Sequence, residues 1–530
     1  MYFPGIRSFF VQIVQILGCI KDSNMTNLNT NKELTTFKTE EKAPETVADA
    51  KDKHKPLGLG GKAVFRQVAM VVLANLGVFS GGMALGYPAV TLKELTDTTR
   101  PLYLTASQAS WFASINAISC PLGGLLSGYL LDKVGRKRTF FTINFTAFIS
   151  WLLLALTTET SQTAMFIQIM IARFIIGITT GLSSSPVGVY SAEICHPRLR
   201  GRLTLGTSVS TAAGILAIYT LGYVIRDNFR MISAIACGYS VIATILTIPV
   251  PESPSWLMMK GRSEESKHAL RFFRALKEDE IEKNEEFNKE FSILTKSATP
   301  SGNKKDQKVS KIIQRPEIYK PLLIMIGLFG FQQFSGIFVV IVYAVQFSIE
   351  AGVTVDPIIC AMLVGLTRIT TTFLVGYILD KWGRRPPAML SGFGMMISMF
   401  VLAATSWFPE FKVPYLPVAC IVFFIFTSTL GLMTLPFSMI SEVYPQVGRG
   451  FAAGLTICCG YLMSFIIIKL YPTMVSGMGN ENVFAFYGVV SGLAVFYVYF
   501  FLPETKGKTL HEIEAYFRNE KKVEGDKNPV

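Results

Sequence analysis

The residues whose types could do chemistry are a few polar side chains inside long apolar segments. Gln332 and Gln333 are neighbours in one segment, and Arg368 lies about midway along the next. An amide offers both a donor and an acceptor to a hydroxyl group, and a guanidinium offers five donors. Because such groups are costly in apolar surroundings without partners, they predict a binding site for a polar solute. For Arg368 the alternative is a structural arginine that snorkels or bonds backbone carbonyls.

Charged residues near the ends of the apolar segments form a second set, and this set repeats along the chain. DKVGRKR, from Asp132 to Arg138, is echoed by DKWGRR at Asp380, 248 residues later. Glu193 is answered by Glu442, and PESPSW by PETKGK, with offsets of 249 and 252 residues. Three marks that repeat at nearly one spacing indicate an internal duplication. In a hydrophobic chain they predict two homologous membrane halves with a substrate path between them.

The composition favours a membrane protein. Half of the 530 residues are hydrophobic, only 16% are charged, and the mean hydropathy is +0.40. The net charge of +13 does not indicate a nucleic-acid partner, because Lys and Arg gather in short loops between apolar segments, as they do in cytoplasmic loops. Most of the eight cysteines lie inside apolar segments and all four histidines lie outside them. We therefore expect no disulfide framework, no metal site and no cofactor.

The elements that must position these residues are twelve apolar segments, each near the ~20 residues that cross a bilayer. Six belong to a first bundle, 65–250, and six to a second bundle, 321–502. The expected limits are 65–90, 107–131, 139–157, 163–191, 204–225, 230–250, 321–347, 357–379, 387–407, 415–441, 451–473 and 482–502. The sequence predicts an all-α polytopic membrane protein with twelve transmembrane helices in two pseudo-symmetric six-helix bundles.

Three segments fall outside the bundles. Residues 1–64 form an N-terminal extension that we expect to be largely disordered, because most of it is polar and short of aromatic residues. The loop 251–320 has helical apolar spacing over 262–293, which predicts short amphipathic helices against the cytoplasmic ends of the bundles, or else a solvated linker helix. A tail follows from 503 to 530. Because the number of spans is even, both termini are expected on the same side, and the Lys- and Arg-rich loops identify that side as the cytoplasm.

The motifs resemble those of the sugar-porter branch of the major facilitator superfamily, from about Val64 to Leu510. DKVGRKR and DKWGRR resemble its paired loop motif, and GFQQFSG resembles its span-seven motif. ARFIIGITTGLSSSPVGVYSAEICHPRLRGR is similar to its span-four signature, and PESPSWLMMKGR and PETKGKTL resemble its marks after spans six and twelve. Among relatives, the chain is most similar to the insect facilitated trehalose transporters. The resemblance implies the major facilitator fold, a carrier instead of an enzyme, and a small-molecule sugar substrate.

The resemblance also assigns roles to the two sets of polar residues. It implies a sugar site at Gln332, Gln333 and Phe437, the last standing where many relatives carry a tryptophan. It implies that salt bridges at the cytoplasmic helix ends hold that side closed and break when the halves rock. The alternative is a static anchor that follows the positive-inside rule. This gating set comprises Asp132, Arg136, Arg138, Glu193, Arg200, Asp380, Arg384, Arg385, Glu442 and Arg449.

Several positions depart from the relatives that carry hexoses. Ser208 stands in place of a glutamine, and Phe338 and Arg368 in place of asparagines. Thr429 and Gly460 stand in place of a glutamate and an asparagine. Ser208, Thr429 and Arg368 remain candidate substrate ligands, but fewer polar partners are left for a glucose-sized solute. Arg368 instead offers a donor fork to substrate oxygens, which favours a sugar with partial negative character or an anion.

These observations predict a facilitative (uniport) transporter of a sugar, trehalose or a hexose, that works by alternating access in the plasma membrane. We expect no acid inside a span away from its cytoplasmic end, which leaves no titrating group for proton coupling. The alternatives are a membrane sugar sensor that does not transport, and a carrier of another polar or anionic solute that uses Arg368. An enzyme is not indicated, because the sequence shows no nucleophile–base pair, phosphate loop or metal cluster. The lipid bilayer is the other expected partner.

Overall fold

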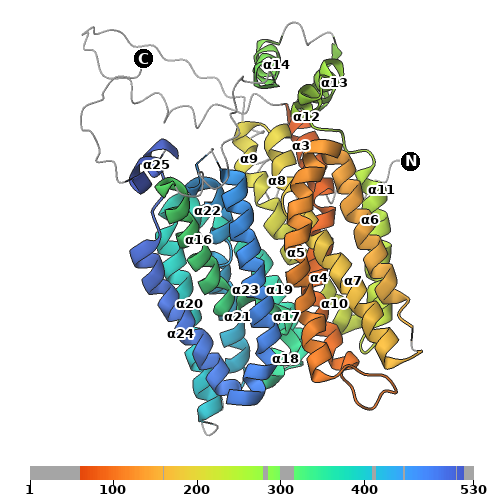
Figure 1. Ribbon diagram of the computed structural model, residues 1–530, viewed down its shortest axis with the longest axis vertical. Helices are drawn as coiled ribbons and strands as arrows, with labels where there is room; N and C mark the ends of the chain where they lie inside the picture. Colours follow the sequence, from red (N-terminus) through yellow and green to blue (C-terminus); the bar gives the residue numbers. More distant parts are fainter. Residues whose placement is uncertain are drawn as a thin grey trace, which may run out of the picture.

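A computed structural model describes residues 60–158, 160–278, 284–298, 315–408, 413–445, 448–508 and 510–518. Throughout these residues the regular structure is helical, without a β-strand. Two groups of long helices stand side by side (Figure 1). The predictions for residues 1–59 lie outside the described residues.

The first half consists of six spans whose limits lie within a few residues of the predicted ones. In chain order these are α3 and α4 (Gly61–Ala74, Leu76–Leu95), α5 (Ala106–Val134), α6 (Arg136–Ala155), α7 and α8 (Gln162–Ser183, Pro186–Ile194), α9 and α10 (Pro197–Thr204, Gly206–Val224), and α11 (Phe229–Thr247). Each span is long and apolar enough to cross a membrane. Three of them are interrupted briefly, at 75, at 184–185 and at 205.

The second half repeats this arrangement. Its helices are α16 (Pro316–Phe334), α17 (Ile337–Val342), α18 (Ala344–Glu350), α19 (Pro357–Trp382), α20 (Arg385–Trp407), α21 and α22 (Leu416–Leu430, Leu435–Val443), α23 (Arg449–Met478) and α24 (Asn480–Phe501). Five spans of this half bring the number of membrane-length helices among the described residues to eleven. The remaining predicted span, 321–347, which is the seventh in chain order, is divided among α16, α17 and α18.

The division of this span has a local cause at Gly336. Its φ is +85°, a backbone conformation that glycine adopts without steric cost. A Cβ at this position would lie 2.8 Å from the ring of Tyr487. Just before the break, the Ser335 hydroxyl donates to the carbonyl of Gln332 at 2.9 Å, so that a carbonyl without a helical partner is satisfied inside the protein. The break therefore comes directly after the two glutamines.

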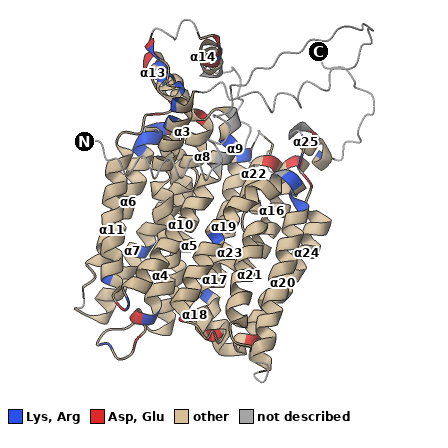
Figure 2. Cartoon of the chain, turned by 180° about the vertical axis from the view of Figure 1, so that it is seen from behind, with Lys and Arg blue, Asp and Glu red and all other residues tan. Residues whose placement is uncertain are grey.

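The two halves meet along two helix pairs, α5 with α23 and α10 with α19. Each pair takes one helix from each half, and one large cluster of buried apolar residues includes members of both halves. Charged residues gather at the two ends of the molecule, and the middle of the bundle is nearly free of them (Figure 2). This distribution is the one that a bilayer requires.

Short helices cover one end of the bundle, which we call the loop end; the opposite end is the far end (Figure 1). These helices are α12 (Pro254–Met259), α13 (Ser263–Arg274), α14 (Glu285–Ala298) and α25 (Leu510–Arg518). The α13 helix packs on the first half, because Phe273 is fully buried beside Tyr190 and its carbonyl accepts from Gln67 Nε2 at 3.2 Å. The sequence reading missed α25, which buries Ile513 and Phe517 against the second half.

Candidate functional site

A cavity of about 260 Å³ lies between the two halves. Its walls come from α4, α7 and α10 of the first half and from α16, α17, α19 and α21–α23 of the second. Eleven of its twenty-two lining residues carry a hydroxyl group, and the rest are mostly apolar or aromatic. An apolar cavity with many converging hydroxyl groups is suited to a small polyhydroxylated solute.

Five of the six residues predicted to bind substrate line this cavity. They are Ser208, Gln333, Arg368, Thr429 and Phe437. The sixth, Gln332, is fully buried and does not belong to the cavity wall. Adjacent residues of a helix point about 100° apart, so only one of the two glutamines faces the cavity.

The two glutamines have different surroundings. Gln332 Nε2 donates to the carbonyls of Leu432 and Met433 at 2.8 and 3.0 Å, in the non-helical stretch between α21 and α22. Gln333 Nε2 donates to Gln332 Oε1 at 3.3 Å. Gln333 Oε1 is buried and receives no hydrogen bond from any described residue. The arrangement fixes Gln333 with an unused acceptor at the cavity.

The positions that depart from the hexose-carrying relatives all lie in the cavity wall. Phe338 and Gly460 line it together with Ser208, Arg368 and Thr429. A Cβ at Gly460 would lie 2.6 Å from the Phe329 ring. That ring packs edge-on against Phe437, with 5.1 Å between the ring centroids. The Phe329–Phe437 pair thus fills the space beside Gly460 that a larger side chain at position 460 would need.

Among the described residues, Arg368 is the only charged one in the wall of this cavity. Its side chain is 9% exposed, and its Nη1 is buried with no hydrogen-bond partner among the described residues. A cation in this position costs free energy unless an anion or an acceptor approaches it. Arg368 is therefore the strongest unused donor of the cavity.

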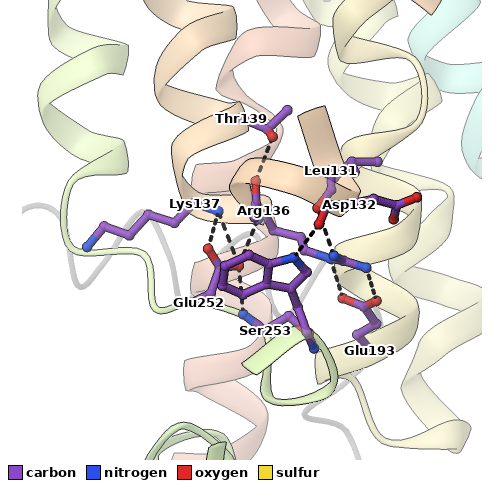
Figure 3. Close-up of polar contacts among 10 residues, drawn as sticks. Leu131, Asp132, Arg136, Lys137, Thr139, Glu193, Glu252 and Ser253 are labelled. Carbon is purple, nitrogen blue, oxygen red and sulfur yellow. Dashed lines mark hydrogen bonds and ion pairs between the residues drawn. The ribbon is translucent and has the colours of Figure 1, made fainter. Parts of the chain in front are cut away.

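The charged network at the loop end of the first half is centred on Arg136 (Figure 3). Its Nε and Nη2 donate to the two carboxylate oxygens of Glu193 at 2.9 and 2.5 Å, and its Nη1 donates to the Leu131 carbonyl at 3.0 Å. Glu252 accepts from the backbone N–H groups of Arg136 and Lys137 at 2.8 and 3.2 Å. Together these contacts join α6, α8 and the segment after α11 by charge-assisted hydrogen bonds.

The second half repeats the network around Arg384. Its Nε and Nη2 donate to Glu442 at 3.1 and 2.8 Å, and its Nη1 donates to the Leu379 carbonyl at 3.1 Å. Glu504 accepts from the backbone N–H groups of Arg384 and Arg385 at 3.0 Å. Four residues of the predicted gating set are thus brought together as two Arg–Glu pairs, and the acids of PESPSW and PETKGK join them.

The other residues of the predicted gating set are placed differently. Asp132 and Arg138 are exposed. Arg385 Nε donates to the Leu502 carbonyl. Arg449 Nε donates to the Tyr444 carbonyl at 3.0 Å. Arg200 is exposed and has interactions of its own. The side chain of Asp380 lies outside the described part of the chain.

The two Arg–Glu pairs each join helices of the same half. A bridge within one half does not cross the interface between the halves, so its geometry alone does not close the loop end. The gating role of this set stays a prediction.

Polar contacts that do cross the interface lie at the far end, and the sequence reading missed them. Arg226 of the first half forms an ion pair with Asp356 of the second. Lys469 of α23 donates to Ser110 Oγ of α5 at 2.7 Å, and Tyr219 of α10 donates to the Ile341 carbonyl of α17 at 2.5 Å. For Arg226, Asp356 and Lys469 the sequence signal was a charge close to a span end, and the Tyr219 contact had no such signal. These contacts join the two halves at this end.

The expectation of no acid in the spans away from the loop end was wrong. Two helices run farther than predicted and include Glu94 and Glu350 at the far end. Glu94 pairs with Arg100 at 2.7 Å, and Glu350 accepts from the Tyr471 hydroxyl. Neither acid lines the cavity.

Comparison with known families identifies the chain. The family model described as sugar (and other) transporter matches residues 10–517. The chain belongs to this family. Its members are transporters and not enzymes, which confirms that prediction.

Sequence relatives of this sugar transporter family member include insect proteins. Facilitated trehalose transporter Tret1 of Drosophila virilis is 30% identical over 458 residues, which are 85% of this chain and 48% of that protein. Tret1 of Polypedilum vanderplanki is 28% identical over 457 residues, which are 85% of this chain and 88% of that protein. The chain spans about half the length of the relatives from Drosophila virilis and Drosophila mojavensis. The predicted resemblance to insect trehalose transporters is confirmed.

Solved structures show the fold of this family member. The inward open conformation of the xylose transporter XylE from E. coli is 24% identical, with a TM-score of 0.70, over 85% of this chain and 99% of that chain. XylE bound to 6-bromo-6-deoxy-D-glucose, an MFS proton:xylose symporter, gives a TM-score of 0.67 at 24% identity, over 85% and 99% of the two chains. The predicted all-α major facilitator fold of a multi-pass membrane protein is confirmed.

Proposed function

We propose that this protein carries a small polyhydroxylated solute of the sugar class across the plasma membrane by facilitated uniport and alternating access. The observation that carries the proposal is the hydroxyl-lined cavity between the two halves, which are joined at the far end by contacts across the interface. A solute bound there reaches the other side when the two halves rock around it. Trehalose and hexoses are the candidate substrates.

The size of the cavity favours a monosaccharide over a disaccharide. At about 260 Å³, it lies just below the ~300–1,000 Å³ of pockets that enclose drug-sized ligands. Trehalose contains two hexose rings and therefore occupies about twice the volume of a hexose. Hexoses are therefore the first solutes to test.

The uncoupled mechanism rests on the chemistry of the cavity wall. No Asp, Glu or His lines the cavity among the described residues, and a guanidinium is not deprotonated in proteins. The two far-end acids have partners away from the cavity. XylE is described as a proton symporter, so measurement must decide between uniport and proton coupling for this chain.

The proposal is tested with purified protein reconstituted into liposomes and a panel of labelled solutes: hexoses, trehalose, polyols and sugar acids. Saturable uptake of at least one of them, absent from protein-free liposomes, is expected. Saturable binding without uptake would contradict transport and favour a sensor. We further propose that both termini and the 251–320 loop are cytoplasmic. An epitope inserted after Lys304 should then be reached by antibody only after permeabilisation, whereas labelling of intact cells would contradict this orientation.

A further inference from the structure

Among the described residues, two buried arginines lie well inside membrane-length helices, away from the helix ends, and their surroundings differ. Arg173, on α7, is 1% exposed. Its Nη1 donates to the Ala84 carbonyl at 2.8 Å and its Nε to the Phe112 carbonyl at 3.2 Å. Its guanidinium also lies over the rings of Phe112 and Tyr87, at 5.1 and 5.9 Å from their centroids. Arg173 shows what a structural arginine looks like in this protein, since carbonyls and aromatic faces satisfy it.

Arg368 has none of these compensations. Among the described residues no carbonyl, carboxylate or hydroxyl accepts from its guanidinium, and its Nη1 is completely buried without a partner. The Tyr219 hydroxyl, on the facing helix α10, is directed to the Ile341 carbonyl instead. No aromatic ring lies beneath the guanidinium among the described residues. A buried cation left in this way requires an acceptor from outside the chain.

The hydroxyl groups of the cavity wall complement this donor. Seven of them donate their proton to a backbone carbonyl close in sequence, so they present only oxygen lone pairs to a solute. They are those of Thr180, Ser183, Ser184, Thr211, Thr372, Thr429 and Thr434. Gln333 Oε1 adds an unused acceptor. The wall therefore offers many acceptors to the hydroxyl groups of a solute and one concentrated donor at Arg368.

We propose that the solute carried by this cavity is a small polyhydroxylated anion, a sugar acid whose carboxylate binds Arg368 while its hydroxyl groups donate to the cavity wall. This inference rests on the proposed transport function and narrows its substrate class. A carboxylate matches the planar guanidinium with two parallel hydrogen bonds. It also neutralises the only charge in the cavity wall, which a neutral hexose does not.

An inorganic anion would supply the same charge. Chloride held beside Arg368 would leave the rest of the cavity to a neutral sugar. A sugar acid and a resident chloride, as the negative charge beside Arg368, differ in the net charge that crosses the membrane. Uniport of a sugar acid moves one negative charge in each cycle and responds to membrane potential, whereas uptake of a neutral sugar beside a resident chloride is electrically silent and requires chloride.

The test compares D-glucuronate with D-glucose, which differ in a carboxylate against a hydroxymethyl group. Both are measured as uptake into proteoliposomes, in chloride and chloride-free buffers, with the membrane potential set by potassium and valinomycin. The variants are the wild type, Arg368→Gln, Arg368→Lys and, as a surface control, Arg262→Gln. We expect glucuronate uptake at least tenfold faster than glucose uptake, accelerated by an inside-positive potential and independent of chloride. Arg368→Gln should lower glucuronate uptake at least tenfold, while Arg368→Lys retains the preference and Arg262→Gln behaves as the wild type.

The melting temperature with and without solute is a second measurement, which tests binding even if a variant folds too poorly for uptake to be measured. Glucuronate should raise the melting temperature of the detergent-purified wild type more than glucose does, and Arg368→Gln should abolish that difference. Glucose uptake equal to or faster than glucuronate uptake, with an unchanged ratio in Arg368→Gln, would overturn the inference and leave the proposed function standing. Chloride-dependent, potential-independent glucose uptake would overturn it in favour of a resident inorganic anion. Uptake of no solute of the panel would overturn both.

Discussion

Lys469 of α23 donates a hydrogen bond to Ser110 of α5 at 2.7 Å, across the interface between the two halves. Its ammonium also lies 4.4 Å from the centroid of the Trp111 ring, on the same helix of the first half. Because the partners belong to different halves, these contacts break whenever the far end opens. They stabilise the conformation that the structure shows relative to one open at the far end.

Replacing Lys469 with Met should therefore shift the protein toward the conformation open at the far end. A hydrogen bond to a charged group contributes about 1.5–3 kcal/mol, so the ratio of the two conformations should change roughly tenfold or more. The measurement is thiol-reagent labelling, from the far-end side of the membrane, of a cysteine introduced at Ser464, a cavity-wall residue that is 4% exposed, and this labelling should become faster in the variant. Lys93→Met is the matched control, since this exposed lysine lies at the same end. Equal labelling rates in Lys469→Met and Lys93→Met would contradict the prediction.

The Arg384–Glu442 pair should stabilise the second half. Glu442 receives two hydrogen bonds from Arg384 and one from the Thr505 hydroxyl at 2.5 Å. Glu442→Gln removes the charge and should lower the free energy of unfolding by about 1–3 kcal/mol, with strongly reduced transport. The measurement is the melting temperature in detergent together with uptake. Glu264→Gln, on the exposed face of α13, should match the wild type.

The same experiment tests whether the pair has a gating role as well. If Glu442→Gln reduces transport while its melting temperature and surface expression stay at wild-type values, the pair acts on the conformational change. If transport and melting temperature both remain unchanged, neither role is supported.

Gly135 should not tolerate a side chain. Its φ is +98°, and a Cβ would lie 2.4 Å from Glu252 Oε2, the carboxylate that accepts the first N–H groups of α6. Gly135→Ala should lower the free energy of unfolding by about 1–3 kcal/mol, measured as a lower melting temperature. Gly128→Ala is the matched control, about two helix turns earlier in the chain. Nothing lies within 4 Å of a Cβ at Gly128. A destabilisation of the same size in both variants would argue against the close approach of Glu252.

Glu504 should make stability depend on pH on the acid side. Burial raises the pKa of its carboxyl group. Hydrogen bonds from the backbone N–H groups of Arg385, Lys506 and Arg384 outweigh this effect, so the pKa lies below its ordinary value. The resulting stabilisation is present above the pKa of the unfolded chain and is lost as the pH falls through the lower pKa of the folded protein.

The measurement for Glu504 is the melting temperature as a function of pH in the wild type and in Glu504→Gln. The wild type should lose stability as the pH falls, and the difference between the two proteins should shrink in the same interval. A difference that stays constant at all pH values would show that the carboxylate does not contribute through its charge.

The sequence predicted the membrane spans, from the lengths of the apolar segments, and the charged sets at their ends, from the internal repeat. Membrane spans require about 20 apolar residues whatever their neighbours, so their limits could be read directly. The duplication assigned Arg136, Glu193, Arg384 and Glu442 to one set of charged residues, and the structure shows which of them pair. The register of the span-eight segment likewise predicted Arg368 as an intramembrane charge, and the structure places it in the cavity wall.

The remainder depends on tertiary geometry. Neighbouring glutamines are equivalent in sequence, and only the rotation of α16 and the break before α22 assign Gln333 to the cavity and Gln332 to the Leu432 carbonyl. The far-end pair of Arg226 and Asp356 joins segments 130 residues apart without any motif. The helices that contain Glu94 and Glu350 extend past their predicted limits. The Phe229 N–H and the Tyr471 hydroxyl, both distant in sequence, donate to these acids, and a hydropathy pattern does not encode such partners.

The central claim is uncoupled carriage by alternating access, and solute counterflow with an imposed pH gradient tests it most directly. Proteoliposomes are preloaded with the unlabelled solute that the wild type carries best, and potassium and valinomycin hold the membrane potential at zero. Labelled solute is then followed inside. The account predicts a transient overshoot of label that decays to equal concentrations, with the same plateau whether or not a pH gradient or a protonophore is present. Net accumulation driven by the pH gradient, or the absence of an overshoot, would contradict it.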